Sequence, residues 1–466
     1  MIDSTATIRS MRRDALKIFQ AGIAAADPRQ CVSRCLTYDG KRLHIALDAD
    51  HTGDIRTGSW EKIHVIAFGK AACSMAQAVQ EILPDRLFAG QGIAVSNDQN
   101  CTPVKNFTVL SAGHPLPDMA GLDAARQVAA RAAAARPGEL LLVLVSGGGS
   151  ALLPCPVPPV TLEEKIATTN ILLASGADIG EINCVRKHLS RLKGGRLAEK
   201  AMPADLHALL LSDVIGDAPG TIASGPTVPD DSRFQDAINV FTSRDVWDKV
   251  PANVRNLLQN GARGELPETP KTGDCIFAHT GYTLVGSNAM SIAACDTAAA
   301  QLHYAVQTYS DRLCGEARNV AEMLVLRAGA MLDRGISRTV AIIAGGETTV
   351  TLRGNGRGGR NQEMALAFAI AAKKHALEHC WTFLSGGTDG RDGPTNAAGG
   401  MVDSGSLKRM QAAGIDPVAS LANNDSYTAL HSSRDLLHTG ATGTNVADLQ
   451  ILLIHPQIYT QPLREN

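Results

Sequence analysis

A glycine triplet between two serines is the clearest candidate site in this sequence of 466 residues. The segment SGGGS (146–150) follows the wholly apolar run LLLVLV (140–145). Glycine lets successive backbone N–H groups turn toward one point, and such a nest at the carboxyl end of a parallel strand binds phosphate or carboxylate. The alternative is a plain tight turn. We predict an anion site formed by Ser146, Gly147, Gly148, Gly149 and Ser150.

Lys70 is a second candidate, because it follows an apolar run (63–68) and precedes an alanine-rich helical segment. The helix dipole disfavours a lysine at the start of a helix, so an anion beside Lys70 would explain its position. The pattern is not that of a P-loop lysine, because Ala71 stands where that motif has Ser or Thr. The alternative is an ordinary surface lysine.

The segment RGNGRGGRNQE (353–363) places glycines and arginines before a helical pattern. The G-x-G-x-x-G fingerprint of dinucleotide-binding loops is matched at Gly354, Gly356 and Gly359. That fingerprint also requires an acidic residue about 20 positions further on, at the end of the next strand, and the nearest acid beyond that strand is Asp389, which is too distant. Arg357 and Arg360 suit a phosphate or carboxylate at least as well. The alternative is a flexible hairpin edge.

Two more loops carry aspartates. Asp213 and Asp217 follow an apolar run, and Asp389 and Asp392 lie among the glycines of 385–400. Carboxylates at the ends of strands hold Mg²⁺ or accept a proton from a hydroxyl. Aspartates in glycine-rich loops also make turns, so both interpretations stay open at this point.

The elements that must position these loops are strands alternating with helices. Apolar runs, each closed by a polar or glycine-rich turn, occur at 63–70, 107–118, 139–150 and 206–213. Because they are apolar on both faces, they predict a parallel sheet covered by helices on both sides, as in a doubly wound α/β domain. An amphipathic helix, with apolar residues spaced from Ile8 to Gly22, precedes them and ends before Pro28.

A second α/β domain is expected toward the C-terminus. Residues 251–274 hold three prolines and few large apolar residues, which indicates a domain boundary or a surface crossover. We therefore expect a domain at 1–250, a linker at 251–274 and a second domain at 275–466. The second domain is predicted to contain a pair of strands, a long helix and a further strand, at 339–347, 348–356, 361–377 and 381–387.

Composition excludes several classes of function. The formal net charge is −2 and aromatic residues are 4% of the chain, so neither a basic surface nor many stacking platforms are offered to nucleic acid. The longest strongly apolar run (140–145) is too short to span a membrane, and charges near the N-terminus interrupt any signal peptide. Ten scattered cysteines without metal spacing predict a reduced, cytoplasmic protein. No G-x-S-x-G or H-E-x-x-H motif supports a hydrolase.

Taken together, the segments resemble the class II glycerate 2-kinases. The resemblance rests on seven motifs: AFGKAA (67–72), SAGHPLPD (111–118), LVSGGGSALL (144–153), NCVRKHLSRLKGGRLA (183–198), LLSDVIGDAPGTIASGPTVPD (210–230), GGETTVTLRGNGRGGRNQEMAL (345–366) and SGGTDGRDGPTNAAGG (385–400). It implies a Rossmann-like α/β domain followed by a smaller α/β domain of the MOFRL type, with the active site in the cleft between them. It also implies transfer of the γ-phosphoryl group of ATP to the 2-hydroxyl of D-glycerate in the presence of Mg²⁺.

The resemblance also implies roles for single residues. The catalytic lysine, acidic residue and arginine of the family correspond to Lys70, Asp213 and Arg360. Substrate contacts are expected from Lys70, Arg360 and Asn288. Contacts with nucleotide phosphates are expected from the glycine loop 146–150 and Glu347, and metal contacts from Asp213 and Asp389. We expect alanine at Lys70 or Arg360 to lower turnover by orders of magnitude and to leave the melting temperature near that of the wild type.

Two alternatives follow from the same residues. Some members of the family carry the label hydroxypyruvate reductase, and the G-x-G-x-x-G match would suit an NAD(P)H-dependent enzyme of that kind. A non-catalytic sensor that binds a phosphorylated acid through the glycine loops is the second. We expect a small-molecule substrate and neither nucleic acid nor a membrane as partner, and the sequence leaves open whether the chain forms a homo-oligomer.

Overall fold

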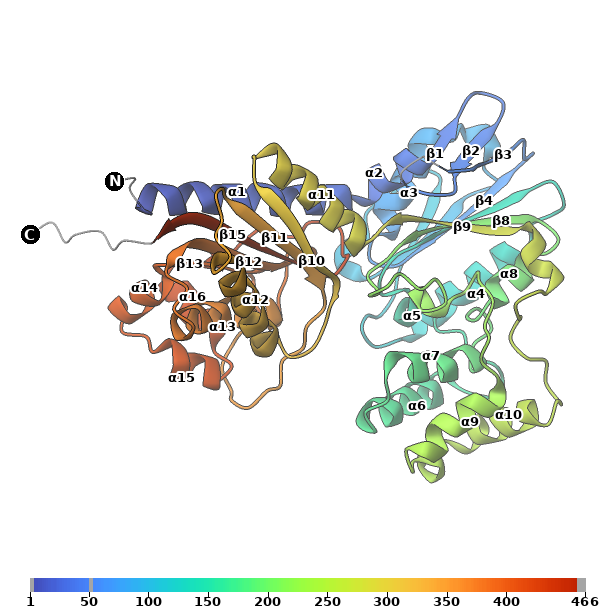
Figure 1. The fold of residues 1–466 in the computed structure, drawn as a ribbon. Coiled ribbons are helices and arrows are strands. Elements are labelled where there is room, and N and C mark those ends of the chain that lie inside the picture. The colour runs from blue at the N-terminus through green and yellow to red at the C-terminus, as the bar shows by residue number, and fades with distance from the viewer. Residues whose placement is uncertain (1–3, 50–52, 459–466) are drawn as a thin grey trace, which may run out of the picture. The chain divides into compact units, whose positions relative to one another are not determined.

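The computed structural model describes residues 4–49 and 53–458, and the chain divides into two compact units. The parallel-sheet unit comprises Pro28–Gly286, and the mixed-sheet unit comprises Met1–Asp27 together with Ser287–Asn466. Each unit is a sheet flanked by helices (Figure 1). The α/β class expected from the sequence is therefore confirmed.

The main sheet of the parallel-sheet unit has six strands. They are β4 (Ile63–Phe68), β5 (Gly92–Ser96), β6 (Phe107–Ser111), β7 (Leu140–Val145), β8 (Asp205–Leu211) and β9 (Thr280–Gly286). Their order is β6-β5-β4-β7-β8-β9 and every pair is parallel. All residues of β4 and β7 are buried, as expected for strands that are apolar on both faces.

Helices cover both faces of this sheet. Their bounds are α2 (Pro28–Cys35), α3 (Ala72–Ile82), α4 (Met119–Ala133), α5 (Gly149–Leu152), α6 (Leu162–Ala174), α7 (Ile179–His188), α8 (Arg196–Ala201), α9 (Phe234–Ser243) and α10 (Ala252–Ala262). Helices α4 and α8 share one core with the sheet, whereas α6, α7, α9 and α10 form a separate helical cluster. A small antiparallel sheet, which the sequence analysis did not anticipate, contains β1 (Leu36–Tyr38), β2 (Leu43–Ala46) and β3 (Ile55–Gly58).

The mixed-sheet unit also has a six-stranded sheet. Its strands are β10 (Ala305–Leu313), β11 (Val340–Gly346), β12 (His379–Gly387), β13 (Gly399–Asp403), β14 (Leu436–Leu437) and β15 (Asp448–Ile458). The order is β10-β11-β15-β12-β13-β14, in which β10 and β11 run parallel and the other neighbours are antiparallel.

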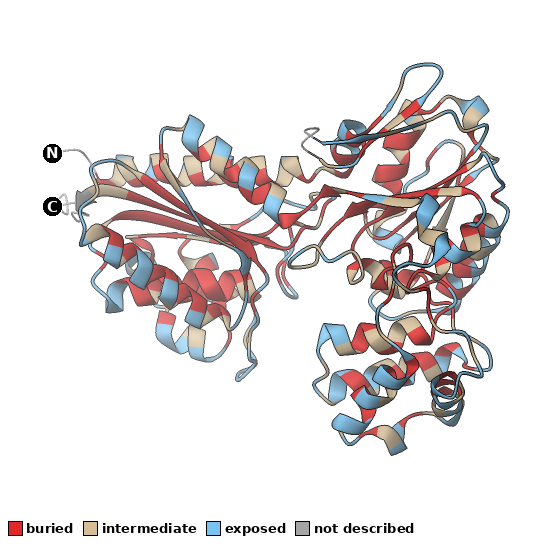
Figure 2. Cartoon of the chain, turned by 45° about the vertical axis from the view of Figure 1, so that its right-hand side comes forward, coloured by how far each residue is buried: buried red, intermediate tan, exposed pale blue. Residues whose placement is uncertain are grey.

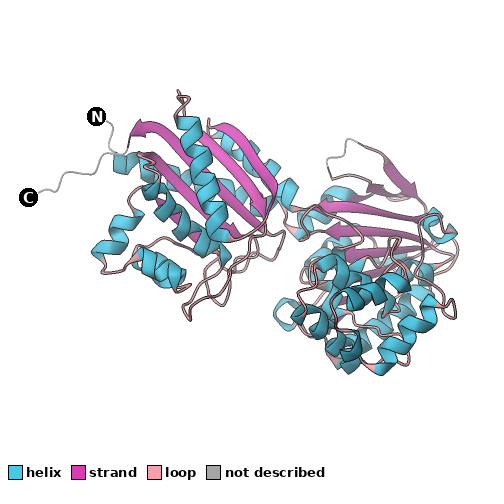
Figure 3. Ribbon diagram, turned by 60° about the horizontal axis from the view of Figure 1, so that its bottom comes forward, coloured by secondary structure: helices cyan, strands magenta, loops and turns pink. Residues whose placement is uncertain are grey.

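Helices lie on both faces of the mixed sheet as well (Figure 3). They are α1 (Ser4–Ala25), α11 (Asn288–Gln301), α12 (Ala317–Leu332), α13 (Arg360–Lys374), α14 (Ser406–Ala412), α15 (Pro417–Ala422) and α16 (Ser426–Ser432). Alternate residues of β11 serve the two faces: Ile343 packs with α1 and α11, and Ile342 packs with α12 and α13. The central strands of both sheets are accordingly buried, whereas edge strands such as β10 are partly exposed (Figure 2).

The unit boundaries differ from those expected from the sequence. Helix α1 belongs to the mixed-sheet unit, because its stripe of Ile8, Ala15 and Phe19 covers a sheet face that is built from the C-terminal part of the chain. The segment 251–274 does not join the units: it contains α10, and the chain then adds β9 to the edge of the parallel sheet before the boundary after Gly286.

One strand that the sequence predicts does not form in the structure. The segment 348–356 was expected to pair with the strand before it, but it forms a loop. Strand β11 already has β10 on one side and β15 on the other, so no edge is left for it to pair with. This pairing depends on β15, about a hundred residues further along the chain, and the local pattern carries no signal of it.

Candidate active site

The strand order of the parallel sheet reverses between β4 and β7. From β4 the chain passes through β5 to β6 on one side, and from β7 it passes through β8 to β9 on the other. The loops that follow β4 and β7 leave in opposite directions, and doubly wound sheets bind their ligands at such a switch point. Lys70 lies just after β4, and the glycine loop 146–150 directly follows β7.

The glycine loop is fastened to the end of β4. The backbone N–H of Lys70 donates to the carbonyl of Gly147 at 2.9 Å, and that of Ala71 donates to Ser146 Oγ at 3.0 Å. Gly69 has φ +123°, and a Cβ there would lie 2.4 Å from the carbonyl oxygen of Ser146. Only glycine fits this position. The backbone of Lys70, rather than its side chain, therefore holds the loop in place.

Asp213 and His114 lie against the same loop. A Cβ on Gly147 would meet Asp213 Oδ2 at 2.0 Å, and a Cβ on Gly148 would meet His114 Nε2 at 3.0 Å and Lys70 Cγ at 3.4 Å. Burial, and then the charge of Lys70, lower the pKa of His114, which favours a neutral imidazole near pH 7. The structure thus brings Lys70, Asp213 and the glycine loop together and adds His114.

The position of His114 in the sequence already indicates a residue at the ligand-binding edge of the sheet. It ends the run FTVLSAGH, directly after β6, where the carboxyl end of a parallel strand points toward the same edge as the other loops. The segment 107–118, which contains His114, predicts a strand and its turn, but His114 itself is not among the predicted site residues.

The contact between Gly147 and Asp213 makes a testable prediction. In Gly147→Ala the new methyl group must displace the Asp213 carboxylate, which is the mobile end of a side chain, so we expect kcat to fall by about 10²-fold. We expect the free energy of unfolding to change by no more than about 0.5 kcal/mol. Steady-state kinetics and urea unfolding measure the two effects.

Gly329→Ala in α12 is the control for that substitution, because a Cβ there meets nothing within 4 Å. Its kcat should equal that of the wild type. Full activity in Gly147→Ala would show that the position of Asp213 does not matter for turnover.

A buried hydrogen-bonded chain supports the glycine loop from the other side. Ser150 Oγ lies 2.7 Å from Ser224 Oγ, which donates to Asn183 Oδ1 at 2.9 Å. Ala223 and Ser224 both have positive φ, at 50° and 62°, in a region that non-glycine residues rarely adopt. Strained backbone of this kind is concentrated at functional sites. The loop after β8 is thus held in a costly conformation next to the glycine loop.

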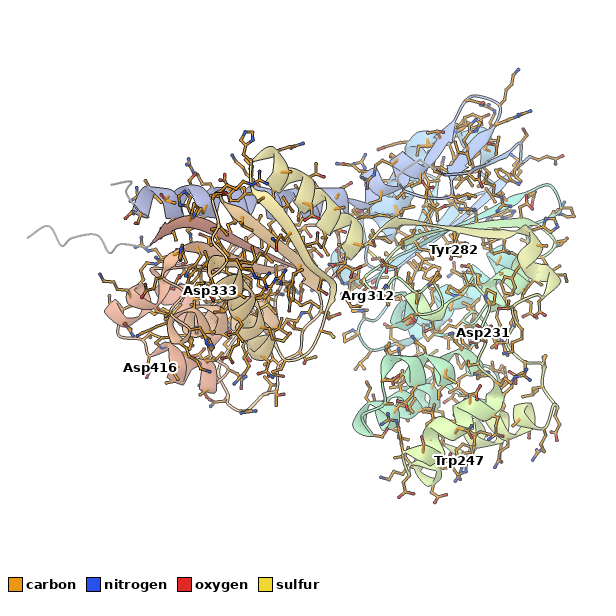
Figure 4. The ribbon with its side chains drawn as sticks, viewed as in Figure 1. Asp231, Trp247, Tyr282, Arg312, Asp333 and Asp416 are labelled. Atoms are coloured by element: carbon orange, nitrogen blue, oxygen red, sulfur yellow. The ribbon has the colours of Figure 1, made fainter. Side chains whose placement is uncertain are left out.

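A cavity of about 480 Å³ lies beside this chain. It is lined by α7 residues that include Asn183 and Lys187, by the loop after β8, and by Asp231 and Tyr282, which Figure 4 labels. Lys187 Nζ bonds to the buried Asp230 at 3.1 Å. The volume is within the range of about 300–1,000 Å³ that small-ligand sites occupy.

Two buried lysines lie behind the glycine loop. Lys193 Nζ donates to the carbonyl of Leu153, at the end of α5, at 3.4 Å, and Lys165 Nζ donates to the carbonyl of Leu189 at 3.3 Å. Burial, and then the charge of Arg186, lower the pKa of Lys165 from 10.5 to about 7. Burial and Lys165 likewise lower the pKa of Lys193.

These lysines predict a pH-dependent stability. Between about pH 7 and pH 10 the unfolded chain binds more protons at Lys165 than the folded chain does, so the free energy of unfolding of the wild type rises with pH across this window. Lys165→Met removes this titration. We expect the stability of the variant relative to the wild type to be greatest near pH 7 and to decline toward pH 10, as measured by urea unfolding. Lys41→Met, at an exposed turn, is the control, and a difference that does not vary with pH would contradict the prediction.

In the mixed-sheet unit, Arg360 begins α13 and is held by two carboxylates. Its Nε and Nη2 donate to the fully buried Asp448 at 2.6 and 3.0 Å, and its Nη1 donates to Glu347 at 2.6 Å. Burial opposes the charge of Arg360, but the bonds and charge of Asp448 hold its pKa above the usual value. An arginine has five N–H donors. Two of those on Arg360 are left for a ligand.

Asp392 fixes the start of α13. Its carboxylate accepts the backbone N–H groups of Asn361 at 3.1 Å and Gln362 at 2.9 Å, which are unpaired donors of the first helical turn. A Cβ on Gly359 would lie within 2.5 Å of this carboxylate, so the glycine is required for the contact. Burial, and then the neighbouring Asp448, raise the pKa of Asp392 to about 6. The sequence analysis singled out Asp392 but not Asp448, which is separated from Arg360 by 88 residues.

Comparison with known proteins gives two family models and several close relatives. Residues 14–259 match the model described as a domain of unknown function (DUF4147), and residues 340–448 match the MOFRL family. The chain is 38% identical to the glycerate 2-kinase of Pyrococcus horikoshii, over 95% of this chain and 97% of that one. It is 41% identical to the D-glycerate 2-kinase of Thermotoga maritima, over 84% and 91% of the two chains.

A crystal structure of the Thermotoga maritima glycerate kinase matches this fold with a TM-score of 0.82 and 37% identity, covering 96% of this chain and all of that one. The chain belongs to the glycerate 2-kinase family. The membership confirms the resemblance drawn from the seven sequence motifs.

The structure does not support the dinucleotide fingerprint in this glycerate 2-kinase family member. A dinucleotide loop connects a strand directly to a helix. Here the preceding strand, β11, ends at Gly346, and the glycines 354–359 belong to a loop whose backbone bonds to Asn423 and Asn424. The glycines are needed there because a Cβ on Gly354 would lie 2.5 Å from the carbonyl of Asn423.

Two other predicted site residues are engaged in the structure. Asn288 is buried at the start of α11, and its Nδ2 donates to the carbonyls of Val446 and Asp448 at 2.7 and 2.9 Å, so it orders the chain that leads to Asp448. Asn288 Oδ1 has no partner among the described residues. Asp389 Oδ1 accepts the backbone N–H of Arg391 at 3.0 Å. This is the turn-making role that the sequence analysis gave as its alternative.

Within residues 4–49 and 53–458, no three His, Cys, Asp or Glu side chains are grouped so that they could hold a metal ion. In the same part of the chain, no helix is long and apolar enough to cross a membrane.

Proposed function

We propose that this protein transfers the γ-phosphoryl group of ATP to the 2-hydroxyl of D-glycerate, which gives 2-phosphoglycerate and ADP. The observation that carries the proposal is the convergence of Lys70, Asp213 and the glycine loop at the switch point of the parallel sheet, in a chain whose relatives are named glycerate 2-kinases. Phosphoryl transfer needs positioning and neutralisation of charge more than covalent chemistry. A glycine loop, a lysine and a carboxylate supply these functions.

Each group has a proposed part in the transfer. The glycine loop 146–150 binds nucleotide phosphates, and the Lys70 ammonium group neutralises charge on the carboxylate of glycerate and on the moving phosphoryl group. In the mixed-sheet unit, Arg360 offers its two remaining donors to an anionic group of the substrates, and Glu347 and Asn288 are proposed as further contacts. As the 2-hydroxyl oxygen attacks phosphorus and ADP leaves, Asp213 accepts the hydroxyl proton.

When bound on ATP, Mg²⁺ neutralises phosphate charge, and Asp213 is the carboxylate at the glycine loop that would hold it. The two roles of Asp213 predict different outcomes for Asp213→Asn. If Asp213 acts as the base, its loss lowers kcat by about 10²- to 10⁴-fold and leaves the Mg²⁺ requirement unchanged. This is the result we expect. If the variant instead needs a higher Mg²⁺ concentration to reach half of its maximal rate, Asp213 holds the metal ion.

A direct assay tests the reaction and its regiochemistry. Purified protein is incubated with ATP, Mg²⁺ and D-glycerate, coupled to enolase and pyruvate kinase in the absence of phosphoglycerate mutase. Immediate formation of pyruvate is expected, because enolase acts on 2-phosphoglycerate. Pyruvate that forms only after mutase is added would place the phosphate on the 3-hydroxyl. Activity with hydroxypyruvate and NADH, and none with ATP, would overturn the proposal in favour of a reductase.

A further inference from the structure

A cavity of about 540 Å³ in the mixed-sheet unit has no part in the reaction proposed above. It is formed by the first turns of α1, the end of β13, α14 and the turn after α16. Asp403, which lines it, lies opposite Thr382 in the sheet, whereas Asp448, which holds Arg360, lies opposite Gly387. Five residues of strand separate these positions, roughly 17 Å at about 3.3 Å per residue. The cavity and Arg360 are at opposite ends of β12.

The charged residues that line this cavity are mostly cationic. Five are basic and two are acidic: Arg9, Arg12, Lys408, Arg409, Arg434, Asp403 and Asp435. Both carboxylates are buried and already paired: Arg12 Nη1 contacts Asp403 at 2.5 Å and Asp435 at 2.9 Å, and Arg409 Nη2 contacts each of them at 2.8 Å. Lys408 takes part in a further interaction, and the four arginines alone give the cavity an excess of two positive charges over the two carboxylates.

Several donors at the cavity have no protein partner. Arg12 uses only Nη1, so its Nε and Nη2 are unpaired within the described residues. In the same part of the chain, the guanidinium groups of Arg9 and Arg434 make neither hydrogen bonds nor ion pairs. Guanidinium groups bind phosphate and carboxylate with two parallel N–H bonds. The cavity thus offers three arginines for an anion.

Arg434 occupies a position where the backbone favours another residue. The N–H of Asp435 bonds to the carbonyl of Leu430 at 2.8 Å and that of Arg434 to the carbonyl of His431 at 3.1 Å, which is the Schellman ending of α16. In that motif the residue at Arg434 is usually glycine, because φ is positive, and here φ is 60°. An arginine at this position costs stability, and no hydrogen bond or ion pair of its side chain within the described structure offsets that cost. Such a local conflict points to a function of the side chain.

We propose that this cavity binds a small organic phosphate at a site separate from the catalytic residues. The excess of two positive charges matches a phosphate monoester, which carries up to two negative charges, better than a single carboxylate. The volume exceeds that of a phosphate group, and Ile8 and Ala412 provide apolar surface for the organic part. The proposal does not depend on the kinase reaction.

The test compares binding of inorganic phosphate, as the probe, to four proteins by thermal unfolding and calorimetric titration at constant ionic strength. They are the wild type, Arg434→Gly, Arg9→Ala, and the control Arg13→Ala, an exposed arginine of α1 that does not line the cavity. We expect phosphate to raise the melting temperature of the wild type and of Arg13→Ala. We expect Arg434→Gly and Arg9→Ala to bind it about tenfold more weakly, or worse, through loss of a charged hydrogen bond.

Arg434→Gly also separates binding from folding. Glycine relieves the positive φ, so its melting temperature without phosphate should be higher than that of the wild type, and a loss of binding cannot then be a loss of structure. Lys70→Met should keep the part of the phosphate response that Arg434→Gly loses, which separates this site from the catalytic one. Equal phosphate responses in Arg434→Gly and the wild type, or none in the wild type, would overturn the proposal.

Discussion

Lys70→Met should lower kcat/KM for glycerate by about 10³-fold and leave the free energy of unfolding close to the wild-type value. The side chain is half-buried beside His114, and within the described residues its ammonium group has neither a hydrogen bond nor an ion pair. The contact that fixes the glycine loop uses the backbone N–H of Lys70, which the substitution keeps. The lost charge therefore affects the ligand and not the fold.

Kinetics with varied glycerate and ATP, together with urea unfolding, measure these effects. Lys41→Met is the matched control, since it removes a lysine from an exposed turn of the same unit and should leave kcat/KM unchanged. If Lys70→Met unfolds at much lower urea than the wild type, or retains most of its activity, the ammonium group is not the anion-binding group of this site.

Arg360→Met should lower both activity and stability, because Arg360 carries out two tasks. It neutralises Asp448, which is fully buried at the start of β15. Removing one partner of a buried ion pair leaves an uncompensated charge, so we expect a loss of about 3 kcal/mol in the free energy of unfolding. From the sequence alone, the melting temperature is expected to stay near the wild-type value. Because the substitution breaks the salt bridge with Asp448, we expect a lower melting temperature instead.

A double-mutant cycle separates the two tasks of Arg360. In Arg360→Met/Asp448→Asn the buried charge is removed as well, so most of the lost stability should return as measured by urea unfolding. The activity should not return, because the donors that face the ligand are still missing. Recovery of kcat together with stability would show that Arg360 acts only by neutralising Asp448.

The parallel sheet could be predicted because its signal is local. Strands such as β4 and β7 are apolar on both faces, and each is followed by a loop whose glycines or polar residues mark its end. Lys70, the glycine loop and Asp213 could be selected as candidates for the same reason: each directly follows such a strand. The parallel order of the strands then brings their carboxyl ends to one edge of the sheet.

Interactions between distant parts of the chain could not be predicted in this way. The pattern from Ile8 to Phe19 predicts a helix, but it does not indicate that this helix packs on a sheet built from residues 305–458. The segment 348–356 resembles a strand, and only the position of β15 next to β11 excludes it from the sheet. Apolar burial is non-directional, so a local pattern specifies that a face is buried and not which partner buries it.

The α/β class, the family and the loops that follow the strands could all be predicted from the sequence alone. The tertiary structure decided which charges meet: it placed His114 beside Lys70, paired Arg360 with Asp448, and left Arg9, Arg12 and Arg434 around one cavity. The periodicity of side chains specifies secondary structure over a few residues. Electrostatic contacts depend on distances of a few ångströms between segments that are far apart in the chain, and only the folded sheet sets those distances.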